Sequence, residues 1–554
     1  MAHTCTPAPT STSRAPAHVV APAIGHDIGQ RRSLADALAH AARVRGDGRI
    51  TCVDNDGIER HWTYRSLNEQ ARHAAAALHA RGVLPGSRVV VRLADPHEFV
   101  LGLWTCFIGG LVAISTYALD DLPEDAAGGR ELAGALQVLD PSALIVSAAE
   151  QGRARALKDA HGWAHLAVVT LADLLAAPAG ELRTVDDPDR VAIIFPTSGS
   201  TGTPKPVTQT ERALLAMAAG SAQMNAFDSR DVFLNWMPTD HVGAIAFLSV
   251  LPTCVAADQV VAAYPRLRAD LFLWIDLMSR TRASVGWVPN HIFNIAAKRL
   301  DREARRDWDL SALRFLVNAG ESINPALVRL FVQRLRPCGL RDDAVRPAFG
   351  MSETCSGITW ATGLHDVDGH VDLGGPIPGA EMRVVGADGR ALREGEVGRL
   401  HLRGPSVTRG YFRVPPDEKF LADGWFDTGD SAFIDGGRLF LTDREGDAIE
   451  DLPMRGHEVE EAIELIPEVL GGHTAVCSAA LEGTRTLAVF YCPEAEHAGA
   501  ALQSRIEELL RRRLPGAAFV VTALRPQDLP RTSIGKIQRK VLRRRLERAG
   551  GPAR

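Results

Sequence analysis

The first two thirds of the chain alternate between short apolar runs and stretches of helical periodicity. Residues 33–45 carry apolar side chains at helical spacing behind Ser33, which predicts a helix capped by a serine hydroxyl. The next segment predicts a hairpin that turns at Asn55-Asp56-Gly57. Further apolar runs have strand length: 88–93, 143–148, 191–195, 232–236, 283–288 and 313–319. This alternation is typical of α/β architecture with largely buried sheets.

The pattern changes near residue 385, where polar and apolar residues alternate and Asp388-Gly389 predicts a hairpin turn. After Thr442 the pattern predicts a smaller unit, with two strands between helices, a third strand and a basic terminal helix. We predict an α/β protein with a large N-terminal domain of mixed β-sheets, packed helices and a β-rich subdomain, followed by a small mobile α+β domain. The predicted parts are a disordered arm (1–32), the large domain (33–446), the small domain (447–545) and a tail (546–554).

Composition narrows the class of protein. A chain of 554 residues is too long for one core, which supports two or more domains. With 62 Lys plus Arg against 67 Asp plus Glu, the net charge of −5 does not call for nucleic acid or an acidic membrane as partner. No apolar run reaches membrane-spanning length, the start lacks a secretory pattern, and the eight cysteines lack zinc-ligand spacing. We therefore expect a cytoplasmic protein, either a monomer or a homodimer.

The strongest chemical signal is FPTSGSTGTPKPV, residues 195–207, directly after an apolar strand. Glycines let backbone N–H groups converge on an anion, hydroxyls donate further hydrogen bonds, and lysine adds a positive charge. A flexible Gly/Ser linker is the alternative, which the preceding strand and the closing lysine and prolines disfavour. The spacing also differs from that of the GxxxxGK[ST] loop. The segment predicts a polyphosphate cradle formed by Thr197, Ser198, Gly199, Ser200, Thr201, Gly202 and Lys205.

This loop resembles the phosphate loop of the adenylate-forming superfamily, which includes acyl- and aryl-CoA ligases, adenylation domains and luciferases. Five further motifs resemble the family's and follow in its order: NAGES (318–322), FGMSET (349–354), GWFDTGD (424–430), LTDREGD (441–447) and PRTSIGKIQR (530–539). Because the motifs follow in the family's order, the resemblance extends over most of residues 33–545. The resemblance implies an ATP-dependent ligase that adenylates a small acid, releases pyrophosphate and passes the acid to an acceptor.

The resemblance also implies residue roles. Thr197, Lys205, Glu353 and Lys536 would be catalytic, Glu353 would also bind Mg²⁺, and Asp447 would be the hinge. Each of these residues also has a simpler interpretation. Glu353, for instance, could be a solvated loop carboxylate, and Lys536 could be one more base of a cationic helix. Besides the phosphate loop, the implied nucleotide-binding residues are Asn318, Ala319, Gly320, Glu321, Phe349, Gly350, Met351, Ser352, Asp430, Arg444 and Lys536.

The acid would bind beside NWMPTDHVGAIAFLSV (235–250), which resembles the family's substrate segment. A core histidine bonded to the backbone is the competing interpretation of His241. Neighbouring walls at 286–295 and 354–360 are largely apolar, which suits an acyl or aryl group. Family members that bind α-amino acids carry an aspartate after an aromatic residue here, and this chain offers only Asp240. The implied pocket residues are His241, Val242, Gly243, Asn318, Gly320, Gly350 and Met351.

Two departures from the family pattern bear on the second half-reaction. Pro206 replaces the glycine that usually follows the loop lysine, and it should stiffen the loop exit. The segment 448–460, AIEDLPMRGHEVE, is shorter and more acidic than the stretch that lines an acceptor thiol's channel. The thiol of CoA or of a phosphopantetheinyl carrier protein is the default acceptor. An amine acceptor, or activation of nitrite, is the alternative, and a catalytically inactive nucleotide-binding protein is the alternative of another class.

Overall fold

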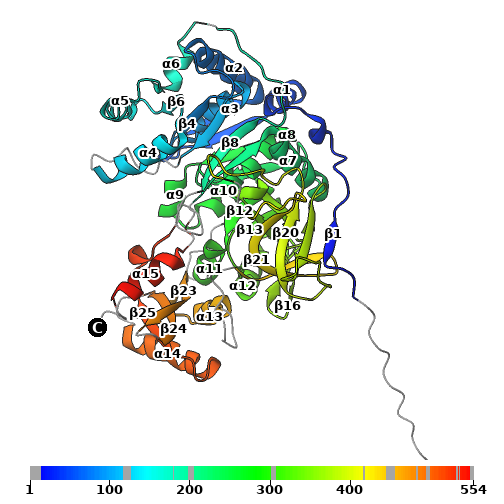
Figure 1. Cartoon of the computed structure of the whole chain (residues 1–554), viewed down its shortest axis with the longest axis vertical. Coiled ribbons are helices and arrows are strands. Elements are labelled where there is room, and N and C mark those ends of the chain that lie inside the picture. The colour runs from blue at the N-terminus through cyan, green and yellow to red at the C-terminus, as the bar shows by residue number, and fades with distance from the viewer. Residues whose placement is uncertain are drawn as a thin grey trace, which may run out of the picture.

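Among the described residues, three sheets and a two-stranded ribbon build the large domain, and one further sheet builds the small one (Figure 1). The computed structural model describes residues 14–116, 126–178, 180–197, 205–300, 307–415, 418–444, 456–481, 484–494, 499–531, 535 and 537–549. Over these ranges, no helix combines the length and the apolar character that crossing a membrane requires. The α/β class with a large and a small unit agrees with the expectation from sequence.

The six-stranded sheet carries the strand that leads into the predicted phosphate loop. Its strands are parallel except for β9, which runs antiparallel to β8 at the sheet edge. Apolar side chains fill both faces of the inner strands, as expected for a sheet covered on both sides. In spatial order the strands are β7 (Ala167–Val169), β6 (Ala143–Val146), β4 (Arg88–Arg92), β5 (Val112–Ser115), β8 (Val191–Thr197) and β9 (Lys205–Thr210).

The nine-stranded sheet has six parallel strands at its centre and antiparallel strands at both edges. Because the carboxyl ends of parallel strands meet at one edge, β12, β13 and β14 deliver their loops to the same side. In spatial order the strands are β18 (Gly375–Pro376), β15 (Ser356–Trp360), β14 (Val345–Met351), β13 (Phe315–Ala319), β12 (Val285–Pro289), β10 (Val232–Asn235), β11 (Asp258–Ala262), β2 (Arg49–Val53) and β3 (Glu59–Thr63).

The five-stranded antiparallel sheet corrects one prediction from sequence. Residues 14–32 were expected to be disordered, yet β1 pairs with β19 and Ala17 is fully buried. The pairing uses backbone hydrogen bonds along an open sheet edge, so it needs no hydrophobic periodicity in the arm. The strands are β1 (His18–Val20), β19 (Glu381–Val385), β20 (Gly398–Arg403), β21 (Phe426–Asp435) and β22 (Arg438–Arg444), and a two-stranded ribbon is formed by β16 (Asp366–Val367) and β17 (His370–Val371).

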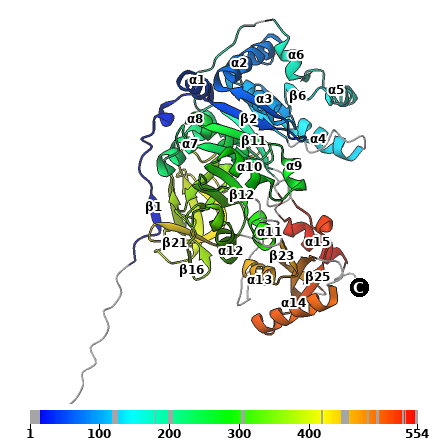
Figure 2. The ribbon, with the colours of Figure 1, turned by 180° about the vertical axis from the view of Figure 1, so that it is seen from behind.

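The helices of the large domain cover the faces of its two larger sheets (Figures 1 and 2). Ser33 caps the first helix through its side chain, as its sequence predicts. The helices are α1 (Leu34–Val44), α2 (Tyr64–Ala80), α3 (Pro96–Ile108), α4 (Ala126–Leu139), α5 (Gln151–Ala160), α6 (Leu171–Leu175), α7 (Glu211–Asn225), the π-helix η2 (Gly243–Val250), α8 (Leu251–Cys254), α9 (Tyr264–Ala269), α10 (Leu273–Thr281), α11 (Asn290–Arg299) and α12 (Pro325–Leu335). Short 3-10 turns lie at η1 (Asp27–Gln30), η3 (Arg336–Cys338) and η4 (Ser352–Thr354).

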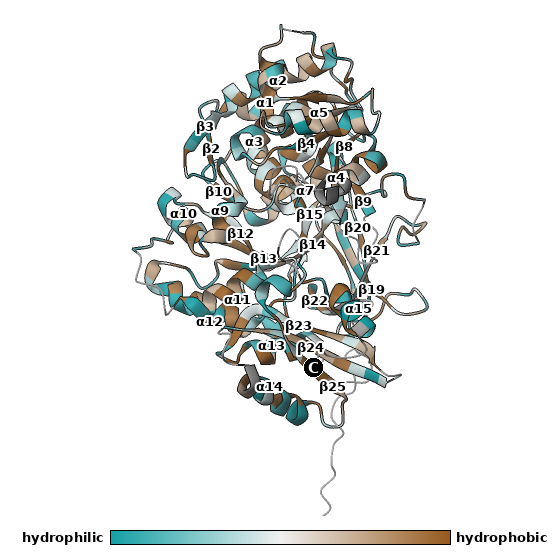
Figure 3. Ribbon diagram, turned by 90° about the vertical axis from the view of Figure 1, so that its left-hand side faces the viewer, coloured by the Kyte–Doolittle hydropathy of each residue, from teal (hydrophilic) through white to brown (hydrophobic). Residues whose placement is uncertain are grey.

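The small domain buries both faces of one three-stranded sheet. Val476 and Val489 face α14, whereas Ala475 and Phe490 face α15, which is the period of two expected of strands. Figure 3 shows hydrophilic residues on the outer turns of α14. The elements are α13 (Gly456–Glu464), β23 (Val469–Leu481), β24 (Thr484–Pro493), α14 (Gly499–Arg513), β25 (Phe519–Ala523), η6 (Pro526–Asp528) and α15 (Arg539–Ala549). This domain packs beside α11 and α12 (Figure 2).

Candidate active site

The predicted phosphate loop joins two paired strands. Thr197 ends β8 and lies opposite Lys205, which begins β9, and Pro196 lies opposite Pro206. Pro206 therefore continues the strand, as a residue that stiffens the loop exit should. The predicted loop residues Ser198, Gly199, Ser200, Thr201 and Gly202 and the side chain of Thr197 lie outside the described residues.

Lys205 and Glu353 come from different sheets and meet on one tyrosine. The Lys205 ammonium lies 5.2 Å from the centre of the Tyr411 ring, and the Tyr411 hydroxyl donates to Glu353 Oε1 at 3.0 Å. A cation over an aromatic face and a hydroxyl on a carboxylate are both favourable. The structure thus brings two predicted catalytic side chains to one place, through a residue that the sequence analysis missed.

Glycine is required in the turn that carries Glu353. A methyl group at Gly350 would lie 2.0 Å from the carbonyl oxygen of Ser356, so no larger residue fits there. The Thr354 hydroxyl closes the turn, accepting from the N–H of Met351 at 3.0 Å and lying 2.7 Å from the carbonyl oxygen of Ser356. The predicted residues Phe349, Gly350, Met351, Ser352 and Glu353 therefore share one rigid bend at the end of β14.

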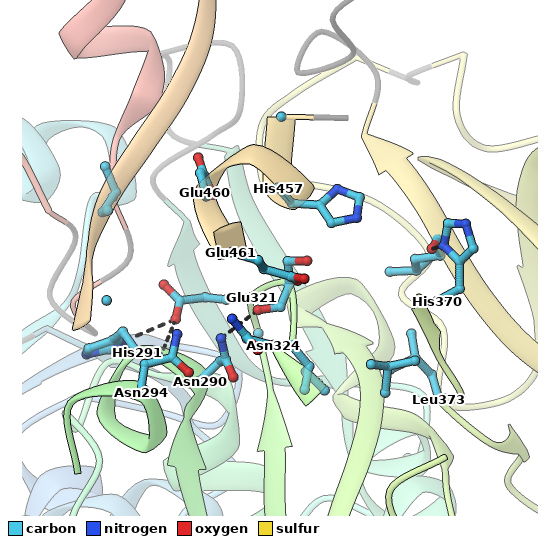
Figure 4. Close-up of a pocket in the computed structure, with 18 of the residues that line it drawn as sticks. Asn290, His291, Asn294, Glu321, Asn324, His370, Leu373, His457, Glu460 and Glu461 are labelled. Carbon is cyan, nitrogen blue, oxygen red and sulfur yellow. Dashed lines mark hydrogen bonds and ion pairs between the residues drawn. The ribbon is translucent and has the colours of Figure 1, made fainter. Parts of the chain in front are cut away.

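The NAGES segment begins on β13 and leaves it through Gly320, whose φ of +89° favours glycine. Asn318 is fully buried and its amide donates to Asn290 at 3.3 Å. Glu321 Oε2 accepts the N–H of His291 at 3.1 Å and lies 3.0 Å from its Nδ1 (Figure 4). The segment is therefore held by the start of α11.

Asp430 lies on β21 opposite Arg444 on β22. Its side chain is buried, and its N–H donates to the Thr428 hydroxyl at 3.0 Å. This pairing places the two motifs side by side on neighbouring strands, where both could serve one ribose. The side chain of Arg444, like the whole of Asp447 and Lys536, lies outside the described residues.

A cavity of about 300 Å³ separates the large domain from the small one. Figure 4 shows the His457 ring of α13 pointing to the side of His370, with His291 and Glu321 on the other side of the view. Lys205, Glu353 and His241 do not line the cavity. The large domain lines the cavity with the predicted residues Gly320, Glu321, Phe349, Gly350, Met351 and Asp430, and the small domain with Gly456, His457, Glu460, Glu461, Glu464, Gly472, Thr474, Val476, Ile537 and Arg539.

The predicted acid-binding segment, residues 235–250, does not line this cavity. His241 Nδ1 accepts the N–H of Gly243 at 3.1 Å, and burial lowers the pKa of His241 to about 4, so the imidazole is neutral near pH 7. Its ring meets the edge of Trp287 at 5.6 Å, and Phe247 packs on Trp287 and Trp360. The walls predicted around 286–295 and 354–360 thus contribute aromatic rings.

The small domain docks on α11 through polar contacts and glycines. Asn294 donates to Glu464 at 2.9 Å, and Lys298 donates to the carbonyl oxygen of Val469 at 2.7 Å. A methyl group at Gly535 would lie 2.6 Å from His291 Nε2, so this backbone packs directly on the imidazole. Gly535 and Ile537 flank Lys536, which places both neighbours of that lysine at the interface.

Glu464 makes the stability of this arrangement depend on pH. Burial raises the pKa of Glu464 to about 7, against 4.5 for an exposed carboxyl. A raised pKa means that the folded form binds the proton more tightly. Protonated Glu464 therefore makes its full contribution to the free energy of unfolding below pH 4.5, and this contribution is lost as the pH rises through 7. We expect the free energy of unfolding to fall between pH 5.5 and 8 by about 1–2 kcal/mol more in the wild type than in Glu464→Gln.

Calorimetry at both pH values would measure this difference. Glu468→Gln serves as the control, because Glu468 is exposed and pairs with Arg505 on the surface. An equal pH dependence in Glu464→Gln and the wild type would contradict the assignment.

Comparison with known proteins assigns the chain to a protein family. The profile of the family described as "AMP-binding enzyme" matches residues 38–412, more than half of the chain. The chain therefore belongs to the AMP-binding enzyme family, and the predicted fold class and the enzyme class of AMP-forming acid ligases are confirmed.

Particular relatives are synthetases of secondary metabolism. The chain is 29% identical to aspulvinone E synthetase melA of Aspergillus terreus and 30% identical to the nonribosomal peptide synthetase btyA of the same species. Both matches cover 93% of this chain but only 58% of the relative, so the chain spans little more than half their length.

Solved structures that resemble this chain also include adenylation domains of synthetases. A structure of McyG A-PCP complexed with phenylalanyl-adenylate is 31% identical, with a TM-score of 0.87 over 96% of this chain and 85% of that one. An adenylation and ketoreductase structure of a keto acid-selecting NRPS module is 28% identical, with a TM-score of 0.87 over 98% of this chain and 47% of that one.

Proposed function

We propose that this chain uses ATP to convert an aromatic 2-oxo acid into its acyl-adenylate, with release of pyrophosphate, and that a carrier-protein thiol then accepts the acyl group, with release of AMP. The meeting of Lys205, Tyr411 and Glu353 beside the cavity that Asp430 lines is the observation that carries the adenylation step. A cation and a carboxylate so placed suit a polyphosphate with its bound metal.

Each residue then has a defined task. Asp430 accepts hydrogen bonds from the ribose, Lys205 offsets phosphate charge, and Lys536 stabilises the negative charge that develops as the acid oxygen attacks the α-phosphorus. Glu353 would hold Mg²⁺, which supplies charge neutralisation on the phosphates when bound. These roles rest on the family motifs and on the positions of Lys205, Glu353 and Asp430.

The choice of acid rests on the aromatic wall. Trp287 and its almost fully buried aromatic neighbours make the surroundings of His241 apolar, which suits an aryl group, and His241 is neutral. Asp240 is the single carboxylate in residues 235–250. An α-ammonium group buried here would depend on Asp240 as its partner, because burying it without one is costly, whereas an oxo group beside a neutral imidazole needs no carboxylate. A keto acid-selecting module among the similar structures supports a 2-oxo acid, whereas the phenylalanyl-adenylate complex supports only the aryl side chain.

The acceptor is proposed from the relatives. A nonribosomal peptide synthetase and an A-PCP structure favour a phosphopantetheinyl carrier over free CoA. The segment whose composition departs from the thiol-channel pattern lies largely outside the described residues.

ATP–pyrophosphate exchange with acids of matched side chain tests the proposal. We expect phenylpyruvate to support exchange at least about tenfold better than phenylalanine, since a missing partner for the ammonium costs more than 1 kcal/mol. Hexanoate and nitrite complete the panel. Faster exchange with phenylalanine would show that Asp240 binds an ammonium group, and no exchange with any acid would refute adenylation by this chain.

A further inference from the structure

A short segment fastens the strand of Lys205 to the turn of Glu353. Residues 408–412, here called the strap, lie between β20 and β21. The N–H of Thr408 donates to the carbonyl oxygen of Glu353 at 2.7 Å, and the Thr408 hydroxyl donates to the carbonyl oxygen of Thr208 at 2.6 Å. At the other end, the N–H of Phe412 donates to the carbonyl oxygen of Pro206 at 2.8 Å. The strap is therefore bonded to both elements.

Tyr411 is the strap's contribution to the site. Its side chain is only 9% exposed, and its backbone forms a bridge with Val207 on β9. The hydroxyl donates to Glu353 Oε1 while the Lys205 ammonium lies over the ring. Both χ angles of a buried tyrosine are fixed by packing, so one phenol sets the positions of two charged groups of opposite sign.

The hydrogen bond leaves one oxygen of Glu353 for a cation. Within the ranges that the structure describes, Oε2 accepts no hydrogen bond, and no group of three or more His, Cys, Asp or Glu side chains could hold a metal. Mg²⁺ typically binds one or two carboxylates together with substrate phosphates and water, so a single carboxylate fits it. Because Oε1 accepts the Tyr411 hydroxyl, Oε2 is the oxygen of Glu353 that would hold a metal.

We propose that Tyr411 is a positioning residue that orients Glu353 toward the metal of metal–ATP and holds Lys205 on the phosphate side. This inference rests on the proposed function, because it assumes that Lys205 and Glu353 serve metal–ATP. It predicts that the hydroxyl governs the metal dependence, whereas the ring governs nucleotide affinity without metal. A tyrosine that only stabilises the fold would change neither quantity selectively.

The experiment measures binding of the fluorescent nucleotide mant-ATP to the full chain, in EDTA and over a range of Mg²⁺ concentrations, with the melting temperature recorded for each variant. For Tyr411→Phe we expect the Mg²⁺ concentration at half-saturation to rise about tenfold, with affinity in EDTA unchanged, since a charge-assisted hydrogen bond is lost. Tyr411→Leu should add a roughly threefold loss of affinity in EDTA, because the ring beneath Lys205 is also removed.

Two comparisons separate positioning from packing. Tyr64→Phe removes another buried tyrosine hydroxyl, one bonded to Gln259, and should leave the Mg²⁺ dependence unchanged. Tyr411→Phe should have no further effect on the Mg²⁺ dependence in a Glu353→Gln background, because it acts through that carboxylate. If one Tyr411 variant fails to fold, the Mg²⁺ dependence of the other is compared with that of the wild type and of Tyr64→Phe.

The outcomes distinguish the two proposals. An unchanged Mg²⁺ dependence in Tyr411→Phe, or an equal change in Tyr64→Phe, would overturn the role of Tyr411 and leave adenylation standing. If no acid supports exchange but the mant-ATP results hold, the proposed function fails and the role of Tyr411 stands.

Discussion

Replacing Lys536 with alanine should lower the rate of ATP–pyrophosphate exchange by about 100- to 1,000-fold while changing ATP affinity little, because the lysine acts on charge that develops in the transition state. Its neighbours support this role. Gly535 packs on His291, and Ile537 lines the cavity between the two domains. Both neighbours of the lysine therefore lie where the two domains meet.

Exchange rates over a range of ATP concentrations would separate kcat from KM for this variant. Lys540→Ala is the control, because it removes a like charge from the start of the basic helix α15, which follows Lys536 in the sequence. Comparable losses in both variants would point to the general charge of the helix, and unchanged exchange in Lys536→Ala would remove the lysine from the mechanism.

Replacing Gly535 with alanine should lower exchange by about 10- to 100-fold through loss of domain docking, equivalent to roughly 1.4–2.7 kcal/mol. The added methyl group would lie 2.6 Å from His291 Nε2 and 2.7 Å from its Cε1, and the φ of +86° is itself unfavourable for alanine. The small domain could then reach the position seen here only by displacing the imidazole. Binding of ATP to the large domain should change little.

Two variants isolate the collision from the backbone strain. Gly516 lies in the same domain and has a φ of +83°, and nothing lies within 4 Å of the carbon that alanine would add. Gly516→Ala should therefore introduce conformational strain without a collision. Gly535→Ala combined with His291→Ala should recover part of the exchange activity, because the space of the imidazole is vacated. Equal effects of Gly516→Ala and Gly535→Ala, or no recovery in the double variant, would rule out the collision.

The sequence predicted well wherever a local rule decides the structure. Ser33 caps a helix, Asp388-Gly389 turns a hairpin, and the strand before the phosphate loop ends at Thr197. Each follows from residues within a few positions of one another. The prediction of a disordered arm over residues 1–32 was wrong for residues 14–32. β1 is ordered because it pairs with β19, which is distant in sequence.

The candidate site was predicted in part for the same reason. Motif residues such as Asp430 and Glu353 were found because their type and spacing resemble a family. His291 and Tyr411 were missed because neither belongs to a chemical motif, and each matters only through a partner far away in sequence. His291 reaches Glu321 and Gly535, and Tyr411 reaches Lys205 and Glu353.

The sequence by itself therefore determined the enzyme class and the order of the elements, and it predicted most of the charged residues of the candidate site, since local periodicity and short motifs carry this information. Only the tertiary structure decided which of those residues meet. It joined Lys205 to Glu353 through Tyr411, separated His241 from the cavity between the domains, and placed Gly535 on His291. The physical reason is that contacts between distant segments depend on how sheets and domains pack, which no local pattern encodes.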